Sequence, residues 1–275
     1  MKQLVKPLAA VFLTSTLAAC SQPEKETNEP EEATVTETKK QEEQEQQTAY
    51  WSYTGQEGPE SWGHLDESYA ACVDGSEQSP INIDASQVKA DEAAEDVETH
   101  YEPTTFSVMN NGHTIQANTV SENNRMIFGG AEYRLVQFHF HTPSEHQFNG
   151  QPYEMELHLV HQNEEGRLAV LGLMIQEGKQ NEEMQAVWDM LPKEKTEQDL
   201  PIGEQINLAA LLPEEDTFFH YDGSLTTPPC TEDVEWVVFE QPIEMSKEQI
   251  EAFQQIFPEN HRPVQPLNER EILNN

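Results

Sequence analysis

Two segments in the middle of the chain alternate apolar and polar residues with a period of two. This pattern is typical of β-strands with one apolar and one polar face. The first segment covers residues 135–141 and the second covers residues 154–160. If the two strands pair, three histidines converge. The polar faces hold Gln137, His139 and His141 in the first segment and Glu154, Glu156, His158 and Val160 in the second, and the opposite faces hold Val136, Phe138 and Phe140, and Met155, Leu157 and Leu159.

Shorter alternating runs recur through residues 49–275, and turn signals such as Asn110-Asn111-Gly112 separate them. Helical patterns are few and short. Ser246 precedes one of them and is a suitable N-cap. We therefore predict a single domain over residues 49–275, mainly β (α+β), built on a large, mostly antiparallel twisted β-sheet with short peripheral helices. The other strand candidates are 105–110, 113–117, 168–176 and 234–240, and the helix candidates are 184–190 and 247–257.

The first 48 residues have a different character from the rest of the chain. Residues 1–19 resemble a signal peptide, because Lys2 and Lys6 precede an apolar core that is too short to span a bilayer. The sequence Leu17-Ala18-Ala19-Cys20 resembles the lipobox of bacterial lipoproteins, which implies cleavage before Cys20 and lipidation of its thiol. An ordinary secreted protein cleaved nearby is the alternative.

Residues 20–48 are then the lipidated cysteine and an acidic tether. The tether has almost no large aliphatic residues, so it is predicted to be disordered. Its simplest role is to hold the domain off the membrane, and binding through its acidic run is the alternative. The protein is thus expected to be an exported cell-envelope lipoprotein that faces the periplasm or the exterior. It would touch the membrane through its lipid anchor only.

Charge and cysteine content narrow the function further. The chain holds 51 acidic and 15 basic residues, for a net charge of −36. This excess of negative charge would repel the phosphate backbone, which excludes nucleic acid as a partner. With Cys20 assigned to lipid, Cys72 and Cys230 form an even pair in an oxidising compartment, which favours a disulfide between them. Two buried free thiols are the alternative.

The three histidines of the two central strands are candidate metal ligands. A lone strand histidine is more often a hydrogen-bonded structural group. Here His139 and His141 share one strand face, and His158 lies on the next predicted strand. Three imidazoles with an open fourth position form the ligand set of a catalytic zinc site, whereas structural zinc sites are closed by four protein ligands. Glu156 is suitably spaced to accept the spare ring N–H of a histidine ligand.

Several motifs resemble the α-class carbonic anhydrases, in the family's order and approximate spacing, from Trp51 to Arg270. Each motif alone is weak evidence, but together they are highly specific. The motifs are Gln78-Ser79-Pro80-Ile81-Asn82-Ile83, Asn110-Asn111-Gly112-His113, Gln137-Phe138-His139-Phe140-His141, Ser144-Glu145-His146, Glu156-Leu157-His158-Leu159-Val160-His161 and Gly223-Ser224-Leu225-Thr226-Thr227-Pro228-Pro229-Cys230.

The resemblance implies a role for each matching residue. His139, His141 and His158 would bind Zn²⁺, with water in the fourth place, as carbonic anhydrases do. Thr226 would accept a hydrogen bond from the zinc-bound hydroxide and donate its own proton to Glu145, because a threonine hydroxyl has only one donor. This relay would orient the hydroxide for attack on CO₂.

The resemblance also implies which residues bind the substrate and which residue carries the released proton. His113 matches the position of the proton shuttle, although a histidine beside a glycine turn is commonly just exposed. Thr227 would help to hold bicarbonate, and Gln137 and Glu156 would orient His139 and His158. An apolar wall would receive CO₂. The residues that match the family's wall positions are Val160, Val170, Leu225, Val234 and Trp236, and ordinary core packing is the alternative reading for all five.

The sequence departs from the animal enzymes at Thr142, where those usually have Trp, and the shortening around Thr142-Pro143 resembles the bacterial branch. Bacterial relatives are often dimers, so the resemblance admits a homodimer. The predicted function is the reversible hydration of CO₂ to bicarbonate and a proton, with Zn²⁺ as cofactor. Weak esterase activity at the same site is one alternative. Another is a non-catalytic binding module or a zinc scavenger, but all three histidines, Thr226 and Glu145 are present and the tether has no histidine.

Overall fold

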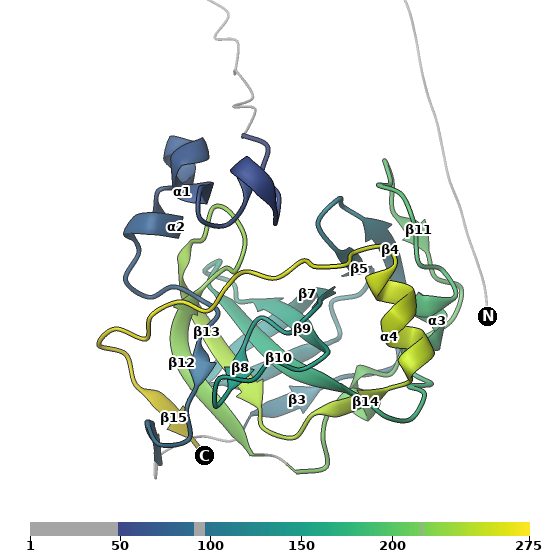
Figure 1. The fold of residues 1–275 in the computed structure, drawn as a ribbon. Helices are drawn as coiled ribbons and strands as arrows, with labels where there is room; N and C mark the ends of the chain where they lie inside the picture. Colours follow the sequence, from purple (N-terminus) through teal and green to yellow (C-terminus); the bar gives the residue numbers. More distant parts are fainter. Residues whose placement is uncertain (1–48, 91–96, 216) are drawn as a thin grey trace, which may run out of the picture. The chain divides into compact units, whose positions relative to one another are not determined.

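The computed structural model describes residues 49–90, 97–215 and 217–275 (Figure 1). The predicted signal peptide, Cys20 and the tether lie outside these residues. Within them, no helix has both the length and the apolar character that crossing a membrane requires.

A mixed sheet of 13 strands dominates the described residues (Figure 1). Its main path runs β11-β4-β5-β7-β9-β10-β13-β12-β15-β2, with β14 beside β10 and the β3–β6 pair beside β7. Most neighbours are antiparallel, as predicted, but β10 pairs in parallel with β13 and β14, and β15 with β2. A separate parallel pair joins β1 and β8. The strands are β1 Asn82–Ile83, β2 Val88–Ala90, β3 Glu98–His100, β4 Phe106–Asn110, β5 Ile115–Thr119, β6 Arg125–Phe128, β7 Ala131–His141, β8 Gln147–Phe148, β9 Met155–Gln162, β10 Leu168–Glu177, β11 Leu200–Pro201, β12 Phe218–Ser224, β13 Glu232–Phe239, β14 Ile243–Met245 and β15 Ile272–Asn274.

The sheet buries apolar residues on both faces, which explains why its central strands β9 and β10 are almost entirely buried. One face carries the larger core. It includes Phe138 and Phe140 of β7 and Leu157 and Leu159 of β9. The other face carries a smaller apolar cluster that includes Val160, and the histidines of the two predicted strands lie on this side of the sheet.

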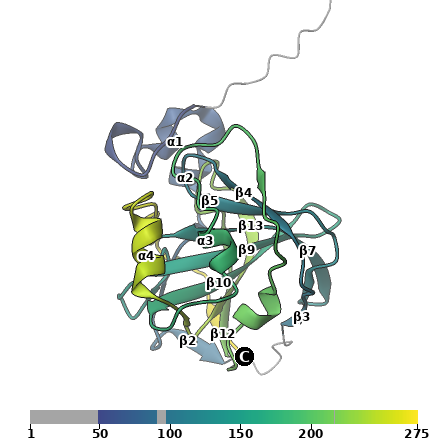
Figure 2. The same cartoon turned by 90° about the vertical axis from the view of Figure 1, so that its right-hand side faces the viewer.

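Helices α3 and α4 cover the larger core (Figures 1 and 2). Phe140 of β7 packs against Trp188 of α3, with ring centroids 5.0 Å apart, and against Phe253 of α4, at 5.8 Å. Helix α4 begins with a complete capping box between Ser246 and Gln249, so the predicted N-cap is confirmed. The helices are α1 Trp62–Leu65, α2 Ala71–Asp74, α3 Gln185–Trp188 and α4 Lys247–Gln254, with 3₁₀ turns at Gly55–Glu57, Glu67–Tyr69 and Leu208–Leu211.

The prediction was wrong for Val136, which was expected on the apolar face of its strand. The pairing of β7 with β9 shifts between Leu135 and Gln137, so the strand carries a bulge there. Leu135 is buried in the core, whereas Val136 is 42% exposed. A bulge adds one residue to one strand and breaks the period of two. His139 and His141 lie beyond the bulge and keep the expected alternation.

The segment before β1 is attached to the rest of the domain by a disulfide between Cys72 and Cys230, as predicted. Both cysteines pack in a small cluster with Trp62. The buried Arg262 guanidinium donates to the backbone oxygens of Cys72 and Ser79, at 3.0 and 2.7 Å. The segments that contain Cys72, Cys230 and Arg262, far apart in sequence, are thereby held together.

Candidate metal centre

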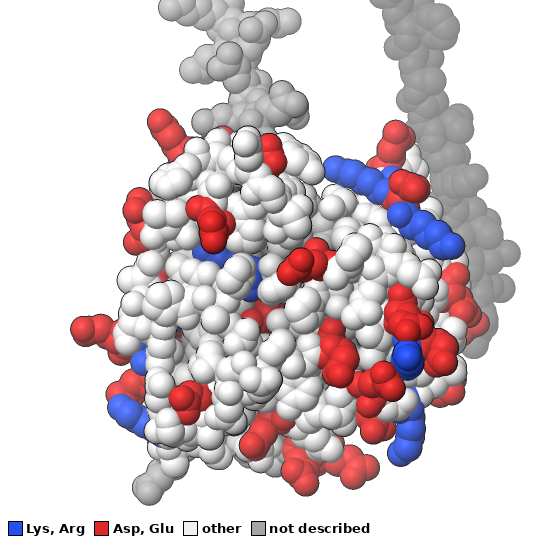
Figure 3. Space-filling view, in the orientation of Figure 1, with Lys and Arg blue, Asp and Glu red and all other residues white. Residues whose placement is uncertain are grey.

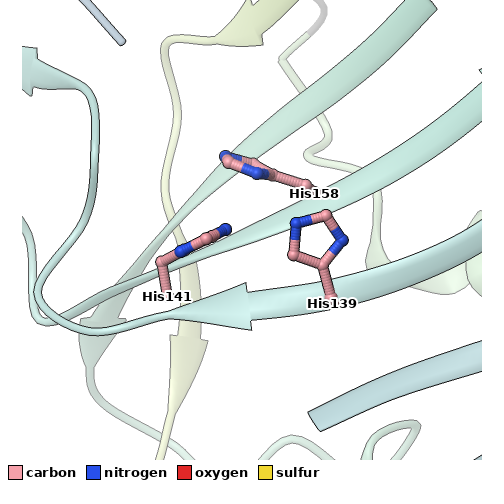
Figure 4. A group of neighbouring side chains, drawn as sticks. All are labelled: His139, His141 and His158. Carbon is pink, nitrogen blue, oxygen red and sulfur yellow. The ribbon is translucent and has the colours of Figure 1, made fainter. Parts of the chain in front are cut away.

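Three imidazoles from two neighbouring strands point toward one another (Figure 4). His139 of β7 lies directly opposite His158 of β9 in the antiparallel register, and His141 follows two residues later on the same face of β7. The ring centroids are 5.0, 5.2 and 4.7 Å apart. Each residue offers one ring nitrogen to a group of three that lie within 4.8 Å of one another.

The second nitrogen of each ring is held by a protein acceptor. His139 Nδ1 donates to Gln137 Oε1 at 2.9 Å, and His158 Nε2 donates to Glu156 Oε1 at 2.8 Å. His141 Nδ1 donates to the backbone oxygen of Asn260 at 2.7 Å. These bonds fix the ring orientations, so that Nε2 of His139 and His141 and Nδ1 of His158 face the centre.

The electrostatics of the centre favour neutral rings. Burial lowers the pKa of His139 well below its ordinary value, and the neighbouring His141 and His158 lower it further. Burial also lowers the pKa of His141 to about 4, and it lowers that of His158 although Glu156 opposes the shift. A neutral imidazole has a lone pair on the inward nitrogen, which is the form that binds a metal.

One inward atom gives a direct test of whether a cation fits. His141 Nε2 is buried and has no hydrogen-bond partner among the described residues. A buried polar atom without a partner is costly, and a metal ion at the centre would satisfy it. Three converging imidazole nitrogens are a donor set suited to Zn²⁺.

Glu156 is the buried acceptor that joins the histidine centre to the surrounding strands. Its Oε2 accepts from the backbone N–H groups of Glu145 and His146, each at 2.8 Å, and its Oε1 accepts from His146 Nδ1 at 2.7 Å as well as from His158. Burial raises the pKa of Glu156, but its interactions with His146 and His158, including the hydrogen bonds from both rings, hold the pKa well below the ordinary value.

Sequence reasoning missed how His146 is held, and it missed Asn260. His146 Nε2 accepts from the Tyr221 hydroxyl at 2.7 Å, and Tyr221 lies 2.9 Å from Ser79 Oγ. One feature of the sequence, a glycine inside a strand, indicates this buried network. Gly172 sits inside the apolar strand β10, opposite His158, and a β-carbon there would lie 3.1 Å from Glu156 Oε1. A glycine inside a strand often marks such a close approach.

Glu145 and Thr226 lie beside the histidines. Glu145 Oε2 is 3.4 Å from His141 Nε2 and 3.9 Å from His158 Nδ1, and its Oε1 accepts from the Arg262 backbone N–H at 2.8 Å. Burial raises the pKa of Glu145, while the nearby His158 and a hydrogen bond from the Thr226 side chain lower it. Thr226 is buried, and the adjacent Thr227 is partly exposed.

The predicted wall residues form one apolar cluster. Val160, Val170 and Trp236 are aligned across β9, β10 and β13 in register. Val234 belongs to the same cluster, and the partly buried Leu225 packs against it. The Trp236 ring lies 4.9 Å from the His158 ring.

His113 lies in the turn that precedes β5, and its backbone oxygen accepts from Asn260 Nδ2 at 3.0 Å. Its ring stacks on the Trp51 indole, with centroids 3.6 Å apart and planes 8° apart. Burial lowers the pKa of His113 to about 4, with a further contribution from the charge of Lys195. In this position the ring is neutral at neutral pH.

A single domain that presents three neutral imidazoles from adjacent strands of a large sheet, with a buried carboxylate beside them, defines a class of candidate metalloenzymes. Comparison with known proteins makes the class specific. Residues 57–275 match the family model of eukaryotic-type carbonic anhydrases. A carbonic anhydrase of Nostoc sp. is 43% identical over 231 residues, covering 82% of this chain and 86% of its own, and one of Klebsiella pneumoniae is 42% identical over 227 residues, covering 82% and 91%.

A solved structure gives the same result. The α-carbonic anhydrase of Thermovibrio ammonificans, in complex with the inhibitor sulfanilamide, superposes with a TM-score of 0.79 at 42% identity, covering 82% of this chain and 99% of that one. The chain belongs to the α-class, or eukaryotic-type, carbonic anhydrase family and is an enzyme of that class.

Proposed function

We propose that this enzyme catalyses the reversible hydration of CO₂ to bicarbonate and a proton at a Zn²⁺ ion held by His139, His141 and His158. The convergence of three neutral imidazole nitrogens within 4.8 Å is the observation that carries the proposal. When bound, Zn²⁺ lowers the pKa of water to about 7, the value known from carbonic anhydrases, and so makes hydroxide available near neutral pH.

Thr226 and Glu145 would orient the nucleophile. Because the threonine hydroxyl has a single proton, donating it to Glu145 leaves only oxygen lone pairs to face the nucleophile. Thr226 would then accept a hydrogen bond from the nucleophile, which keeps its proton, and would so direct the nucleophile's lone pair at the carbon of CO₂. Burial raises the pKa of Glu145, whereas the Thr226 side chain and the Arg262 N–H, which donates to Glu145 Oε1 at 2.8 Å, favour the ionised carboxylate that this role requires.

The apolar cluster beside His158 would receive the substrate. CO₂ has no net charge and no dipole, so it loses little by leaving water for the surface of Val160, Val170, Val234 and Trp236. The same surface gives no hydrogen bonds to competing water. Bicarbonate is charged and polar, and Thr227, which is partly exposed next to Thr226, would hold it before release.

The proton produced must reach solvent, and His113 would carry it. An imidazole with its ordinary pKa near 6.5 can take up a proton at neutral pH. On the Trp51 indole the pKa of His113 is about 4, so the ring gives the proton up there. Uptake away from the indole and release on it would allow one side chain to perform both halves of the transfer.

The N-terminal sequence supports export and lipid anchoring at Cys20. The disulfide between Cys72 and Cys230 fits an oxidising compartment. The anchor would place the domain at the cell surface or in the periplasm, where CO₂ and bicarbonate exchange with the medium.

Stopped-flow measurement of CO₂ hydration tests the proposed function. The purified enzyme is assayed as isolated, after treatment with a zinc chelator, and after zinc is restored. We expect activity to be lost with the metal and to return with it. A protein that binds zinc and does not hydrate CO₂ would be a binding module on this fold, and the proposal would be wrong.

A further inference from the structure

The loop between α3 and β11 is docked on the turn that carries His113. Asn110 makes three of the contacts. Its Nδ2 donates to the Pro192 oxygen at 3.0 Å, its backbone oxygen accepts from the Thr196 N–H at 2.9 Å, and its N–H donates to Thr196 Oγ1 at 3.2 Å. Strand β11 then pairs with β4, which ends at Asn110. The position of this loop relative to His113 is therefore well defined.

Lys195 lies in this loop and crosses Gly112, the residue before His113. A β-carbon built on Gly112 would be 3.3 Å from Lys195 Cδ and 3.8 Å from its Nζ. Gly112 has a φ of +93°, a conformation in which side chains are rare. The glycine thus allows the lysine side chain to lie close to the backbone of the turn, and the Lys195 ammonium is near enough to His113 to contribute to its lowered pKa.

Of the other groups around His113, Trp51, Tyr53 and Asn260 carry no charge. Trp51 is apolar, and the buried Tyr53 next to Trp51 has its pKa raised by burial, so it stays neutral. Asn260 presents an amide. The residues on either side of Asn260 are Glu259, which is exposed, and His261, with Glu259 Oε1 3.7 Å from His261 Nδ1.

A positive charge next to His113 is unusual in this chain. With 51 acidic and 15 basic residues, the protein as a whole attracts protons and would raise the pKa of a histidine on its surface (Figure 3). The Lys195 ammonium acts in the opposite direction and disfavours a second positive charge on the neighbouring imidazole.

We propose that Lys195 is a positioning residue that, from its place over Gly112, speeds the release of the proton from His113 in an otherwise acidic protein. This inference rests on the proposed role of His113 as the proton shuttle. Without the ammonium, His113 keeps its proton to higher pH and returns more slowly to the neutral form that accepts the next one.

The test replaces the charge and measures His113 directly. The zinc-loaded enzyme is prepared as wild type, as Lys195→Gln, and as Lys195→Arg, which keeps the charge. Lys179→Gln removes an exposed lysine from a different loop and is the matched control. The pKa of His113 is read by NMR titration of its ring. Turnover in weak buffer is measured over the same pH range.

We expect Lys195→Gln to raise the pKa of His113 by about half a unit, the order of the effect of one unit charge several ångströms away in water. The pH dependence of turnover should move by the same amount, with no change in KM. Lys195→Arg and Lys179→Gln should match wild type. An unchanged pKa in Lys195→Gln, or an equal shift in Lys195→Arg, would overturn the inference.

A separate variant distinguishes this inference from the proposed shuttle. If His113→Ala leaves turnover in weak buffer unchanged, the proposed shuttle is wrong and the role of Lys195 falls with it. Suppose instead that His113→Ala lowers turnover and that added imidazole restores it. If Lys195→Gln then leaves the pKa of His113 unchanged, the shuttle stands and only the inference about Lys195 fails.

Discussion

Replacing Glu156 with glutamine is the most informative single change, because it alters charge and hydrogen bonding but keeps the shape of the side chain. The carboxylate accepts four hydrogen bonds of 2.7 to 2.8 Å, two from ring nitrogens of His146 and His158 and two from backbone N–H groups. A carboxylate has only acceptors, whereas the amide has one acceptor atom and one donor atom. Neither orientation of the amide can reproduce the four bonds.

If the amide nitrogen faces the imidazoles, His158 must present a lone pair at Nε2. Its proton then moves to Nδ1, the nitrogen that faces the metal centre. If the amide nitrogen instead faces the two backbone N–H groups, buried donors meet donors, at a cost of about 1 to 3 kcal/mol for each unsatisfied group. Loss of such a supporting carboxylate typically weakens metal binding by roughly 10- to 100-fold, or about 1.4 to 2.7 kcal/mol.

Zinc affinity is measured by competition with a chromophoric chelator, and CO₂ hydration is measured at saturating zinc. Glu154→Gln is the control, because Glu154 lies two residues away and is exposed. We expect Glu156→Gln to lose affinity in the stated range and Glu154→Gln to behave as wild type. If Glu156→Gln binds zinc as tightly as wild type, the reasoning about the His158 tautomer is refuted.

Three further predictions concern the relay, a buried histidine and the disulfide. Thr226→Val should lower kcat/KM for CO₂ by about 100-fold, because it removes the hydroxyl that orients the nucleophile, while Thr226→Ser should retain most activity; equal rates for the two variants would contradict the relay. Burial lowers the pKa of His161 to about 4, below the 6.5 expected when unfolded, so folding disfavours its protonation. The contribution of the neutral His161 to the free energy of unfolding is therefore complete above pH 6.5 and is lost as the pH falls toward 4, a change of about 3 kcal/mol in all. In urea unfolding, the stability of His161→Gln should fall by that much less than the stability of wild type over this pH range. The double variant Cys72→Ser/Cys230→Ser should be less stable by about 4 to 5 kcal/mol, because the bond closes a loop of 158 residues, and an unchanged denaturation midpoint would contradict this.

The local pattern of the sequence predicted the central strands well and the long-range pairings poorly. Short apolar or alternating runs placed β9 and β10 close to their observed bounds, and alternation placed the second half of β7, whose first four residues were missed. The bulge at Val136 was missed, since an extra residue in one strand leaves no mark in the pattern of that strand alone. The parallel pairing of β10 with β13 and β14 was also missed, because it depends on strands far apart in the chain.

At the metal centre, too, the local pattern was predictable and the long-range contacts were not. The spacing of His139, His141 and His158 was visible because β-strand geometry puts such residues on one face. Asn260 was not visible, because it lies in an irregular segment about 120 residues away and its backbone oxygen, which any residue has, is what holds His141. Its side chain also receives the Thr142 N–H and donates to the Phe140 oxygen. Such contacts come from the tertiary fold alone.

Metal content is the most direct test of the central claim. The protein is purified without added zinc, and its metals are quantified by mass spectrometry beside a His139→Ala variant whose fold is checked by circular dichroism. The account predicts close to one zinc per wild-type chain and a large loss in the variant. A wild-type protein free of zinc, or a variant that retains as much of it, would contradict the assignment of the three imidazoles as the metal centre.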